Sequence, residues 1–208
     1  MSEYKKIKVN IVNLGFNNTF SIFQAFRSLG CKVKLIDKID KNKSDLLVLP
    51  GVGSFSKGMK TLREKSFDTY IQDYTSNNNN KMLGICLGMQ LFFSESCEFG
   101  KTSGLNLISG KVKKISNKVN KVPHIGWNTI KISKKNNFFN NNNKQFYFVH
   151  SYYCEPKNKK LILSETNLEK LNFCSSVITD NLIGVQFHPE KSSIAGINLL
   201  KNILKYFI

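Results

Sequence analysis

Long apolar runs are missing from the 208-residue sequence, since none reaches the roughly 18 residues that a membrane-spanning helix needs. A secretory signal is missing too, because the first residues, MSEYKKIKVNIV, pass from charge into a strand-like pattern without a small-residue cleavage site. We therefore expect a soluble, unexported protein of the cytoplasm that has no membrane partner.

Cysteine is scarce: the chain has five, an odd number, and no pair with CxxC spacing. This pattern suits neither a disulfide framework nor a zinc site, so we expect a reducing compartment, no metal and no cofactor. Four of the five are expected to be small buried hydrophobic side chains. These four are Cys31, Cys97, Cys154 and Cys174.

Acidic residues are few as well, with 14 Asp and Glu against 31 Lys and Arg and a net charge of +17. Such an excess raises the question of nucleic-acid binding. The lysines, however, are spread along the chain together with asparagine runs at residues 77–80 and 140–143, and no basic and aromatic stripe recurs at a fixed period. We expect no nucleic-acid partner. Binding to duplex DNA or RNA that weakens with salt would support that alternative.

Strand-like and helix-like patterns alternate over the first ninety residues. Strands are expected at residues 7–12, 33–36, 45–49 and 82–85, and helices at 21–29, 56–74 and 87–93. This order predicts an α/β fold with an open, largely parallel central sheet flanked by helices. The chain is long enough for one compact domain, residues 1–208.

The second half of the chain is β-rich. Beyond Gly110 we expect strands at 112–115, 129–132, 146–150, 161–166, 174–179 and 183–187, and then a final helix at 193–206. Residues 136–144 are expected to form a polar surface loop between two strands.

A glycine-flanked cysteine occurs where a buried strand turns directly into a helix, in the sequence Gly84-Ile85-Cys86-Leu87-Gly88. This is the pattern of a nucleophile elbow with cysteine in place of serine, and the sharp turn requires glycine on both sides. Cys86 is expected to be exposed at the tip, where the helix N-terminus favours a thiolate, and the Leu87 N–H is placed to stabilise an oxyanion. The alternative is a tight glycine turn with an incidental cysteine.

A later strand ends in an acid–base pair, in the sequence Gly184-Val185-Gln186-Phe187-His188-Pro189-Glu190. Residues two apart in extended chain point the same way, so His188 and Glu190 can face one cleft. Glu190 would then accept a hydrogen bond from one imidazole nitrogen while the other serves the Cys86 thiol. A His-Pro-Glu triplet alone is weak, but with the elbow it predicts a Cys-His-Glu triad.

A glycine loop, Leu49-Pro50-Gly51-Val52-Gly53-Ser54-Phe55, follows another buried strand. Such a loop can bring backbone N–H groups to a developing negative charge. The Gly-Lys-Ser/Thr ending of a phosphate-binding loop is absent, so we expect no nucleotide site.

The segments LPGVGSF, GICLGMQLFF, PHIGWN, FYFVHSYY and GVQFHPEKSS occur in this order over essentially the whole chain. Together they resemble the class I glutamine amidotransferases, which have a flavodoxin-like fold. Within that class they are most similar to the glutaminase subunits of imidazole glycerol phosphate synthase, from histidine biosynthesis.

The resemblance implies that Cys86 attacks the side-chain amide of glutamine and forms a glutamyl thioester. His188 would protonate the departing ammonia, and Glu190 would orient His188. The resemblance also implies a set of oxyanion and glutamine-binding residues, one of whose peptides must turn before it can donate. These residues are Gly51, Val52, Gly53, Leu87, Gln90, Ser151 and Tyr152.

A partner is implied as well. In this family the ammonia passes, unexposed to solvent, into a (βα)8-barrel cyclase subunit, which makes imidazole glycerol phosphate and an aminoimidazole carboxamide ribonucleotide. Trp127 and Lys191 match positions at that heterodimer interface. The alternative for these two is a buried tryptophan and a solvated lysine.

One segment departs from the family pattern. Residues 13–18 read Asn-Leu-Gly-Phe-Asn-Asn, where the family has Asp-Tyr-Gly-x-Gly-Asn. This leaves open a second client, a sugar-modifying amidotransferase supplied through a barrel-like partner. A different hydrolase on this scaffold, such as a cysteine peptidase that cleaves peptides without any partner, also remains open.

Overall fold

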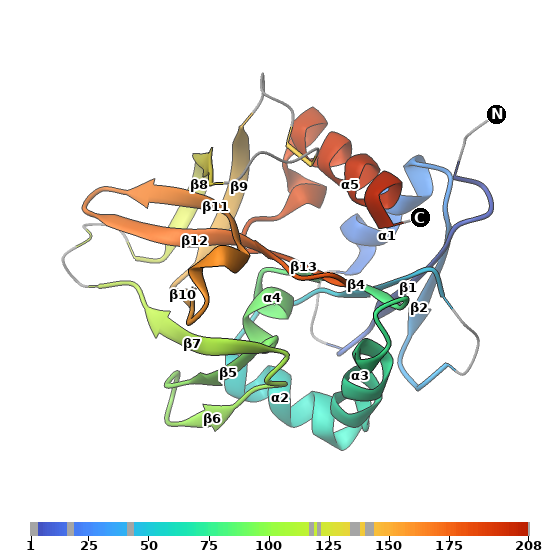
Figure 1. Cartoon of the computed structure of the whole chain (residues 1–208), viewed down its shortest axis with the longest axis horizontal. Helices are drawn as coiled ribbons and strands as arrows, with labels where there is room; N and C mark the ends of the chain where they lie inside the picture. Colours follow the sequence, from blue (N-terminus) through green and yellow to red (C-terminus); the bar gives the residue numbers. More distant parts are fainter. Residues whose placement is uncertain are drawn as a thin grey trace.

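The computed structural model describes residues 4–15, 19–40, 44–116, 119, 122–133, 138–139 and 144–207 (Figure 1). None of the helices in these ranges is both long and apolar enough to cross a membrane. Of the segment that departs from the family pattern, residues 16–18 lie outside the described part of the chain.

The first half alternates strands with helices. Its strands are β1 (Lys8–Val12), β2 (Lys32–Ile36), β3 (Leu46–Leu49), β4 (Lys81–Ile85), β5 (Phe93–Ser96) and β6 (Thr102–Ser103). Its helices are α1 (Thr19–Ser28), α2 (Phe55–Glu64), α3 (Phe67–Ser76) and α4 (Leu87–Leu91).

The second half is made of strands until its last helix. Its strands are β7 (Ile108–Lys114), β8 (His124–Ile132), β9 (Gln145–His150), β10 (Tyr152–Pro156), β11 (Ile162–Leu168), β12 (Leu171–Ile178) and β13 (Leu182–Val185). Two short 3-10 turns, η1 (Lys159–Leu161) and η2 (Pro189–Lys191), precede β11 and the final helix α5 (Ser193–Phe207).

The sheet divides into a parallel half and a half that is antiparallel except for the parallel pair of β5 and β7. The parallel half has the order β2-β1-β3-β4-β13, with every neighbouring pair parallel. Every residue of β3 and β13 is buried, as expected of parallel strands covered on both faces. The antiparallel half continues from β13 through β12, to which β10 and β11 both pair, and β8 joins β11 to β9. The predicted α/β fold with a β-rich second half is therefore confirmed.

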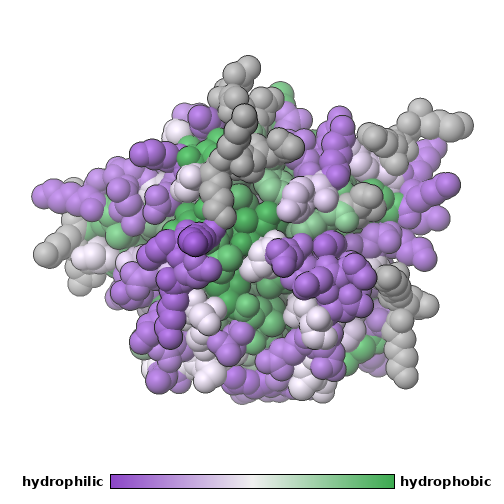
Figure 2. Space-filling view, viewed as in Figure 1, coloured by the Kyte–Doolittle hydropathy of each residue, from purple (hydrophilic) through white to green (hydrophobic). Residues whose placement is uncertain are grey.

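Helices cover both faces of the parallel half. Figure 1 shows α1 and α5 on one face and α2, α3 and α4 on the other. The buried apolar residues form two clusters that match these layers: one includes Phe26 of α1 and Leu200 of α5, and the other includes Leu62 of α2 and Ile71 of α3. In Figure 2 hydrophobic residues gather in the middle of the viewed face, over α4 and β13, between hydrophilic residues.

The expected helix at residues 56–74 is wrong as a single element, because the chain breaks between α2 and α3. Ser66 has the left-handed conformation, with φ 58°. In a continuous helix Leu62 and Phe67, five residues apart, would point about 140° away from each other. The break lets both side chains be fully buried in one cluster.

The expected helix at residues 87–93 is too long, since α4 ends at Leu91. Its last carbonyls are taken by a following loop: the N–H of Leu105 donates to Leu91 O, and the N–H of Leu107 donates to Phe92 O. Phe93 then begins β5, which pairs with β7. The strands β5, β6 and β10 have no counterpart in the sequence prediction.

The expected polar loop at residues 136–144 is wrong in part. Phe138 and Phe139 are buried, with 4% and 6% of their surface exposed, and Phe138 packs edge-on against Tyr206 of α5. Residues 136–137 and 140–143 lie outside the described part of the chain.

Candidate active site

Three neighbouring parallel strands deliver the predicted reactive residues to one edge of the sheet. β3, β4 and β13 lie side by side, so their carboxyl ends meet at the same edge. The glycine loop follows β3, Cys86 follows β4, and His188 comes shortly after β13. Such an edge is where α/β sheets hold their ligands.

The turn at Cys86 has the geometry of a nucleophile elbow. Cys86 lies between β4 and α4 with φ 54° and ψ −108°, a conformation that L-residues rarely adopt. A Cβ atom on Gly88 would lie 1.7 Å from the Leu49 carbonyl oxygen, and one on Gly84 would lie 2.6 Å from the Phe92 ring. The glycines at both positions are therefore required by close packing.

Cys86 is not exposed at the tip of this turn, contrary to the sequence prediction. Only 5% of its surface is accessible, because the segment in which β9 runs on into β10, residues 149–152, covers the elbow. The amide of Gln186 donates to the sulfur at 3.6 Å, and the Val149 carbonyl lies 3.8 Å from it. The nucleophile is thus buried, and it borders the cavity that it helps to line.

His188 and Glu190 form a buried pair. The Nδ1 of His188 lies 2.8 Å from Oε1 of Glu190, and both side chains are only 3% exposed. The expected extended geometry is wrong, since residues Pro189–Lys191 form the turn η2 and it is this turn that brings the carboxylate back to the imidazole. The His188 N–H donates to the Tyr147 carbonyl at 2.8 Å, which ties the pair to β9.

The charge state of His188 follows from its neighbours. Burial disfavours the imidazolium, but the negative charges of Cys86 and Glu190 outweigh burial and raise the pKa of His188 to about 10. The second ring nitrogen, Nε2, is buried and has no hydrogen-bond partner within the described part of the chain. A protonated His188 therefore has a donor to offer to a leaving group.

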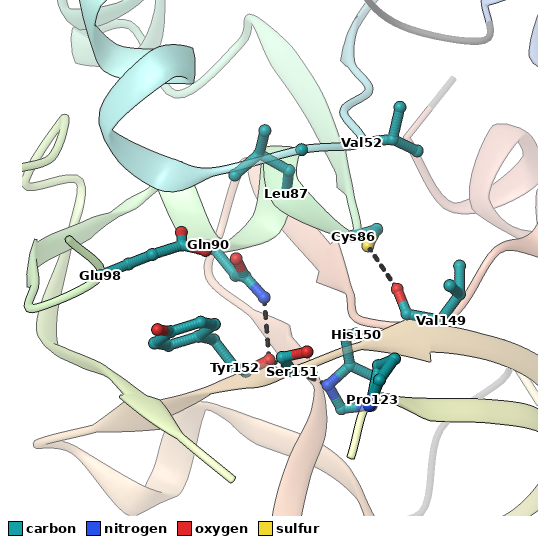
Figure 3. Close-up of a pocket in the computed structure, with 11 residues that line it drawn as sticks. Val52, Cys86, Leu87, Gln90, Glu98, Pro123, Val149, His150, Ser151 and Tyr152 are labelled. Atoms are coloured by element: carbon teal, nitrogen blue, oxygen red, sulfur yellow. Dashed lines mark hydrogen bonds between the residues drawn. The ribbon is translucent and has the colours of Figure 1, made fainter.

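A cavity of about 240 Å³ opens beside Cys86. Figure 3 shows Gln90 and Glu98 on one side, Cys86 on the other, and Ser151 and Tyr152 along its floor. Seven residues predicted from the sequence line it, namely Val52, Gly53, Cys86, Leu87, Gln90, Ser151 and Tyr152. Gly51, His188 and Glu190 line a separate small hollow instead.

Gln90 is held in one orientation. Its Nε2 donates to the Tyr152 carbonyl at 2.9 Å and to Oε1 of Gln186 at 3.1 Å (Figure 3 shows the first of these). Both amide protons are therefore used within the protein, and Oε1 remains to accept from a ligand. Gln186 was missed by sequence reasoning, although a lone polar residue in a buried apolar strand end two positions before His188 was a usable signal.

Glu98 is a second residue that sequence reasoning missed. Its side chain lines the cavity, and its Oε2 accepts a hydrogen bond of 2.6 Å from the Phe55 N–H. Burial raises the pKa of this carboxyl, and the Phe55 hydrogen bond opposes that rise. An ammonium group in the cavity would be paired with this carboxylate. No sequence pattern distinguishes Glu98 from a surface acid.

The predicted oxyanion donor is occupied. The Leu87 N–H donates to the Gly51 carbonyl at 3.3 Å, so it does not point into the cavity. A Cβ on Gly51 would lie 2.7 Å from Leu87 Cβ, and this close approach is possible only for glycine. In this conformation the loop blocks one donor and directs a carbonyl, not an N–H, at the elbow.

The two residues predicted to meet a partner lie close to one another. The Trp127 ring packs edge-on to Tyr147 at 6.2 Å, and the Lys191 ammonium lies 6.0 Å from the centre of the same Tyr147 ring. Trp127 is 52% exposed and its neighbour Ile125 is 60% exposed. The alternative of a buried tryptophan is therefore excluded.

All five cysteines are described, and all are free. Cys31, Cys154 and Cys174 are buried as expected, whereas Cys97 is exposed, which corrects the prediction for that residue. Burial raises the pKa of Cys31 to about 11 and raises those of Cys154 and Cys174 well above the ordinary value, so these thiols are unreactive. No group of three or more His, Cys, Asp or Glu side chains suited to a metal ion occurs in the described ranges.

Comparison with known proteins adds to this geometry. The family model described as glutamine amidotransferase class-I matches residues 10–206. The protein described as imidazole glycerol phosphate synthase subunit HisH of Chlorobaculum tepidum is 39% identical over 201 residues, which cover 95% of this chain and all of that protein. The protein of the same description from Sulfolobus acidocaldarius is 39% identical over 199 residues, covering 94% of this chain and 96% of its own.

The fold matches solved structures as well. A crystal structure described as a glutamine amidotransferase superposes with a TM-score of 0.71 at 16% identity, covering 96% of this chain and 98% of that one. At this identity the match bears on the fold alone.

Proposed function

The chain belongs to the class-I glutamine amidotransferases, and from this premise we propose that it is the glutamine-hydrolysing subunit of an imidazole glycerol phosphate synthase. The observation that carries the proposal is the strained Cys86 elbow beside the buried His188–Glu190 pair, opening on a cavity with a carboxylate at its far side. Within this proposal Cys86 is the nucleophile, His188 the acid–base residue and Glu190 the residue that orients it.

The cavity suits the two ends of glutamine. Glu98 offers a carboxylate to the α-ammonium group, and Gln90 offers its free Oε1 to the same end of the ligand. Ser151 and Tyr152 supply polar groups along the floor for the α-carboxylate. The side-chain amide then extends to Cys86 on the opposite side.

The proposed reaction splits one hydrolysis into two steps. The Cys86 thiolate adds to the amide carbon, and the C–N bond then breaks as His188 gives its proton to the departing ammonia. A thioester between Cys86 and the glutamyl group remains. His188, now neutral, takes a proton from water as the water attacks the thioester, and glutamate leaves as the thiolate is restored.

The conformation of the glycine loop provides a structural reason for glutamine hydrolysis to be controlled. An oxyanion needs N–H donors where the Gly51 carbonyl now accepts from Leu87. Turning the peptide between Gly51 and Val52 would release the Leu87 N–H and direct the Val52 N–H toward the elbow, with Gly53 at φ 108° giving the loop freedom to move. We propose that hydrolysis is slow until this peptide turns.

The exposed surface of β8 supplies a place for a partner. Ile125 and Trp127 expose apolar area next to Lys191, a combination suited to the centre and rim of an interface. We propose a heterodimer with a (βα)8-barrel cyclase, which receives the ammonia and forms imidazole glycerol phosphate and the aminoimidazole carboxamide ribonucleotide. A single domain over residues 1–208 and a location in the cytoplasm belong to the same proposal.

The test is glutamate release from glutamine, measured with the chain alone and with a cyclase subunit plus its ribonucleotide substrate. We expect strong hydrolysis in the complete mixture and little with the chain alone, because the loop must turn. Hydrolysis of glutamine without formation of imidazole glycerol phosphate would contradict the histidine-pathway client. Cleavage of peptides by the chain alone would contradict the amidotransferase assignment.

A further inference from the structure

Two buried histidines face each other beneath the cavity. His124 of β8 lies directly opposite His150 of β9 in the antiparallel register, and each is only 6% exposed. Nδ1 of His124 lies 2.9 Å from Nε2 of His150. Neither belongs to the triad, although His150 lines the cavity.

The hydrogen-bond partners at the two ends of the histidine pair determine which ring nitrogens carry a proton. The Tyr152 carbonyl, which can only accept, lies 2.9 Å from Nδ1 of His150, so that nitrogen carries a proton. At the other end the Asn128 amide is fixed, because its Oδ1 accepts from the Thr129 N–H and its Nδ2 donates to the Asn167 carbonyl.

The same Nδ2 of Asn128 lies 3.3 Å from Nε2 of His124, which must therefore accept, and Nδ1 of His124 must carry the proton. His124 then donates to Nε2 of His150. Both ends thus give the same assignment: two neutral rings, each protonated at Nδ1, with all hydrogen bonds running toward the Tyr152 carbonyl.

The surroundings favour this neutral state. The pKa of His150 is lowered to about 3, mainly by burial and in smaller part by the nearby His124 and His188, against the opposing effect of the Tyr152 hydrogen bond. Burial also lowers the pKa of His124. The His124 ring stacks on Phe148 at 4.9 Å, and the rings of both histidines contact Phe173, so the pair is packed among apolar rings.

The Tyr152 carbonyl joins the pair to the glutamine site. It accepts from His150 and also from Nε2 of Gln90, at 2.9 Å in each case. Gln90 in turn donates to Gln186, whose amide donates to the Cys86 sulfur. The orientation of the Gln90 amide, and hence the side it presents to a ligand, depends on where this carbonyl points.

We propose that His124 and His150 form a neutral histidine dyad that acts as a positioning unit for glutamine. The dyad fixes the Tyr152 carbonyl, and this carbonyl holds Gln90 with Oε1 directed at the substrate. This role rests on the proposed function for its substrate, while the dyad itself rests on the hydrogen bonds alone.

The first test separates hydrogen bonding from packing in the complex with the cyclase subunit. In His150→Leu and His124→Phe the chain of donors is broken, and KM for glutamine should rise about tenfold, the usual effect of one lost hydrogen bond, while kcat changes less than about threefold. His150→Asn keeps a donor near the Nδ1 position and should restore KM to within about threefold of the parent. Phe173→Leu alters the packing around both rings without removing a hydrogen bond, so it should lower the melting temperature and leave KM unchanged.

The second test uses the unmodified full-length chain and needs no activity. Nitrogen-15 NMR of its imidazole groups should show His124 and His150 both protonated at Nδ1 and unchanged between about pH 5 and pH 9. Protonation at Nε2 in either ring, or titration within this range, would overturn the dyad. A KM unchanged in both His150→Leu and His124→Phe would overturn its role in positioning. Absence of glutamine hydrolysis in the parent complex would instead contradict the proposed function, and the NMR result would still decide the dyad.

Discussion

The parallel and antiparallel halves of the sheet contribute different things to the active site. In the parallel half, the turns after β3, β4 and β13 carry the glycine loop, Cys86 and the His188–Glu190 pair. In the antiparallel half, Trp127 lies on β8, and the floor of the cavity is formed where β9 runs on into β10. Bond-making groups therefore come from the strand-to-turn junctions of the parallel half, whereas the surface on which a ligand would rest comes from the antiparallel half.

The largest effect should come from the nucleophile of the parallel half. Cys86→Ser replaces a thiolate by a poor nucleophile and should lower the rate of glutamine hydrolysis on the order of 10⁴-fold or more, because triad members act as a unit. The free energy of unfolding should change by less than about 1 kcal/mol, since the two side chains are similar in volume. Glutamate release and thermal unfolding measure the two quantities.

Cys97→Ser is the matched control for this change, because Cys97 is exposed and lies outside the cavity. It should leave glutamate release unaltered. Retained activity in Cys86→Ser, or its loss in Cys97→Ser, would break the assignment of the chemistry to the parallel half.

The next largest effect should come from the carboxylate behind His188. Glu190→Gln keeps the shape but removes a charge that raises the His188 pKa, and should lower kcat on the order of 10²- to 10⁴-fold. In the parent, His188 loses its proton only as the pH approaches about 10, so the alkaline limb of kcat/KM should lie near that pH. In Glu190→Gln this limb should move to lower pH.

The raised pKa of His188 also makes the free energy of unfolding depend on pH. The folded pKa of His188 lies above its ordinary value of 6.5, so its stabilisation is complete below about pH 6.5 and is lost as the pH rises toward about 10. Chemical denaturation of parent and Glu190→Gln across this range measures it. A parent whose alkaline limb lies near pH 6.5 would contradict a protonated resting His188.

A smaller effect, on stability, tests whether the elbow is fixed by packing. Gly88→Ala would place a Cβ 1.7 Å from the Leu49 carbonyl oxygen, so the chain must shift, at a cost of about 3 kcal/mol or more. Gly100 has φ +105° but open space around it, so Gly100→Ala should cost only about 1 kcal/mol of backbone strain. Urea unfolding of both variants compares them, and equal losses would mean that the Leu49 carbonyl gives way at little cost and that close packing does not fix the elbow.

The smallest effect should come from the outer surface of the antiparallel half. Trp127→Ala should weaken binding of the cyclase subunit about 10- to 100-fold, as for a tryptophan at the centre of an interface. Because Trp127 is half exposed, the free energy of unfolding of the isolated chain should hardly change. Calorimetric titration with the partner measures the affinity. Ile39→Ala, at a side chain 42% exposed beyond β2, is the control and should bind as the parent does.

The two halves also differ in how far the sequence predicts them. The Cys86 elbow and the His188–Glu190 contact were predictable, because each depends on a few consecutive residues whose glycines or turn leave little choice. The burial of Cys86 was not predictable, because it depends on β9 and β10, which are separated from the elbow by some sixty residues. Local motifs describe a turn but not what covers it.

The recognition residues were predictable only in part. Gln90 and Tyr152 were identified by resemblance, but their shared hydrogen bond and the dyad below them join segments that are separated in the chain. His150 was not identified from the sequence, and its pairing with His124 follows only from the strand register. The break at Ser66 was missed because helical periodicity holds within α2 and within α3, and only the phase shift between Leu62 and Phe67 marks the junction.

The central claim is that Cys86 alone among five cysteines is the nucleophile, and that it is reached through the glutamine cavity. Mass spectrometry after treatment of the full chain with a diazoketone analogue of glutamine tests this most directly. We expect a single label on Cys86, suppressed by excess glutamine, with the exposed Cys97 unlabelled. A label on Cys97 with Cys86 unmodified, or labelling that excess glutamine does not suppress, would contradict it.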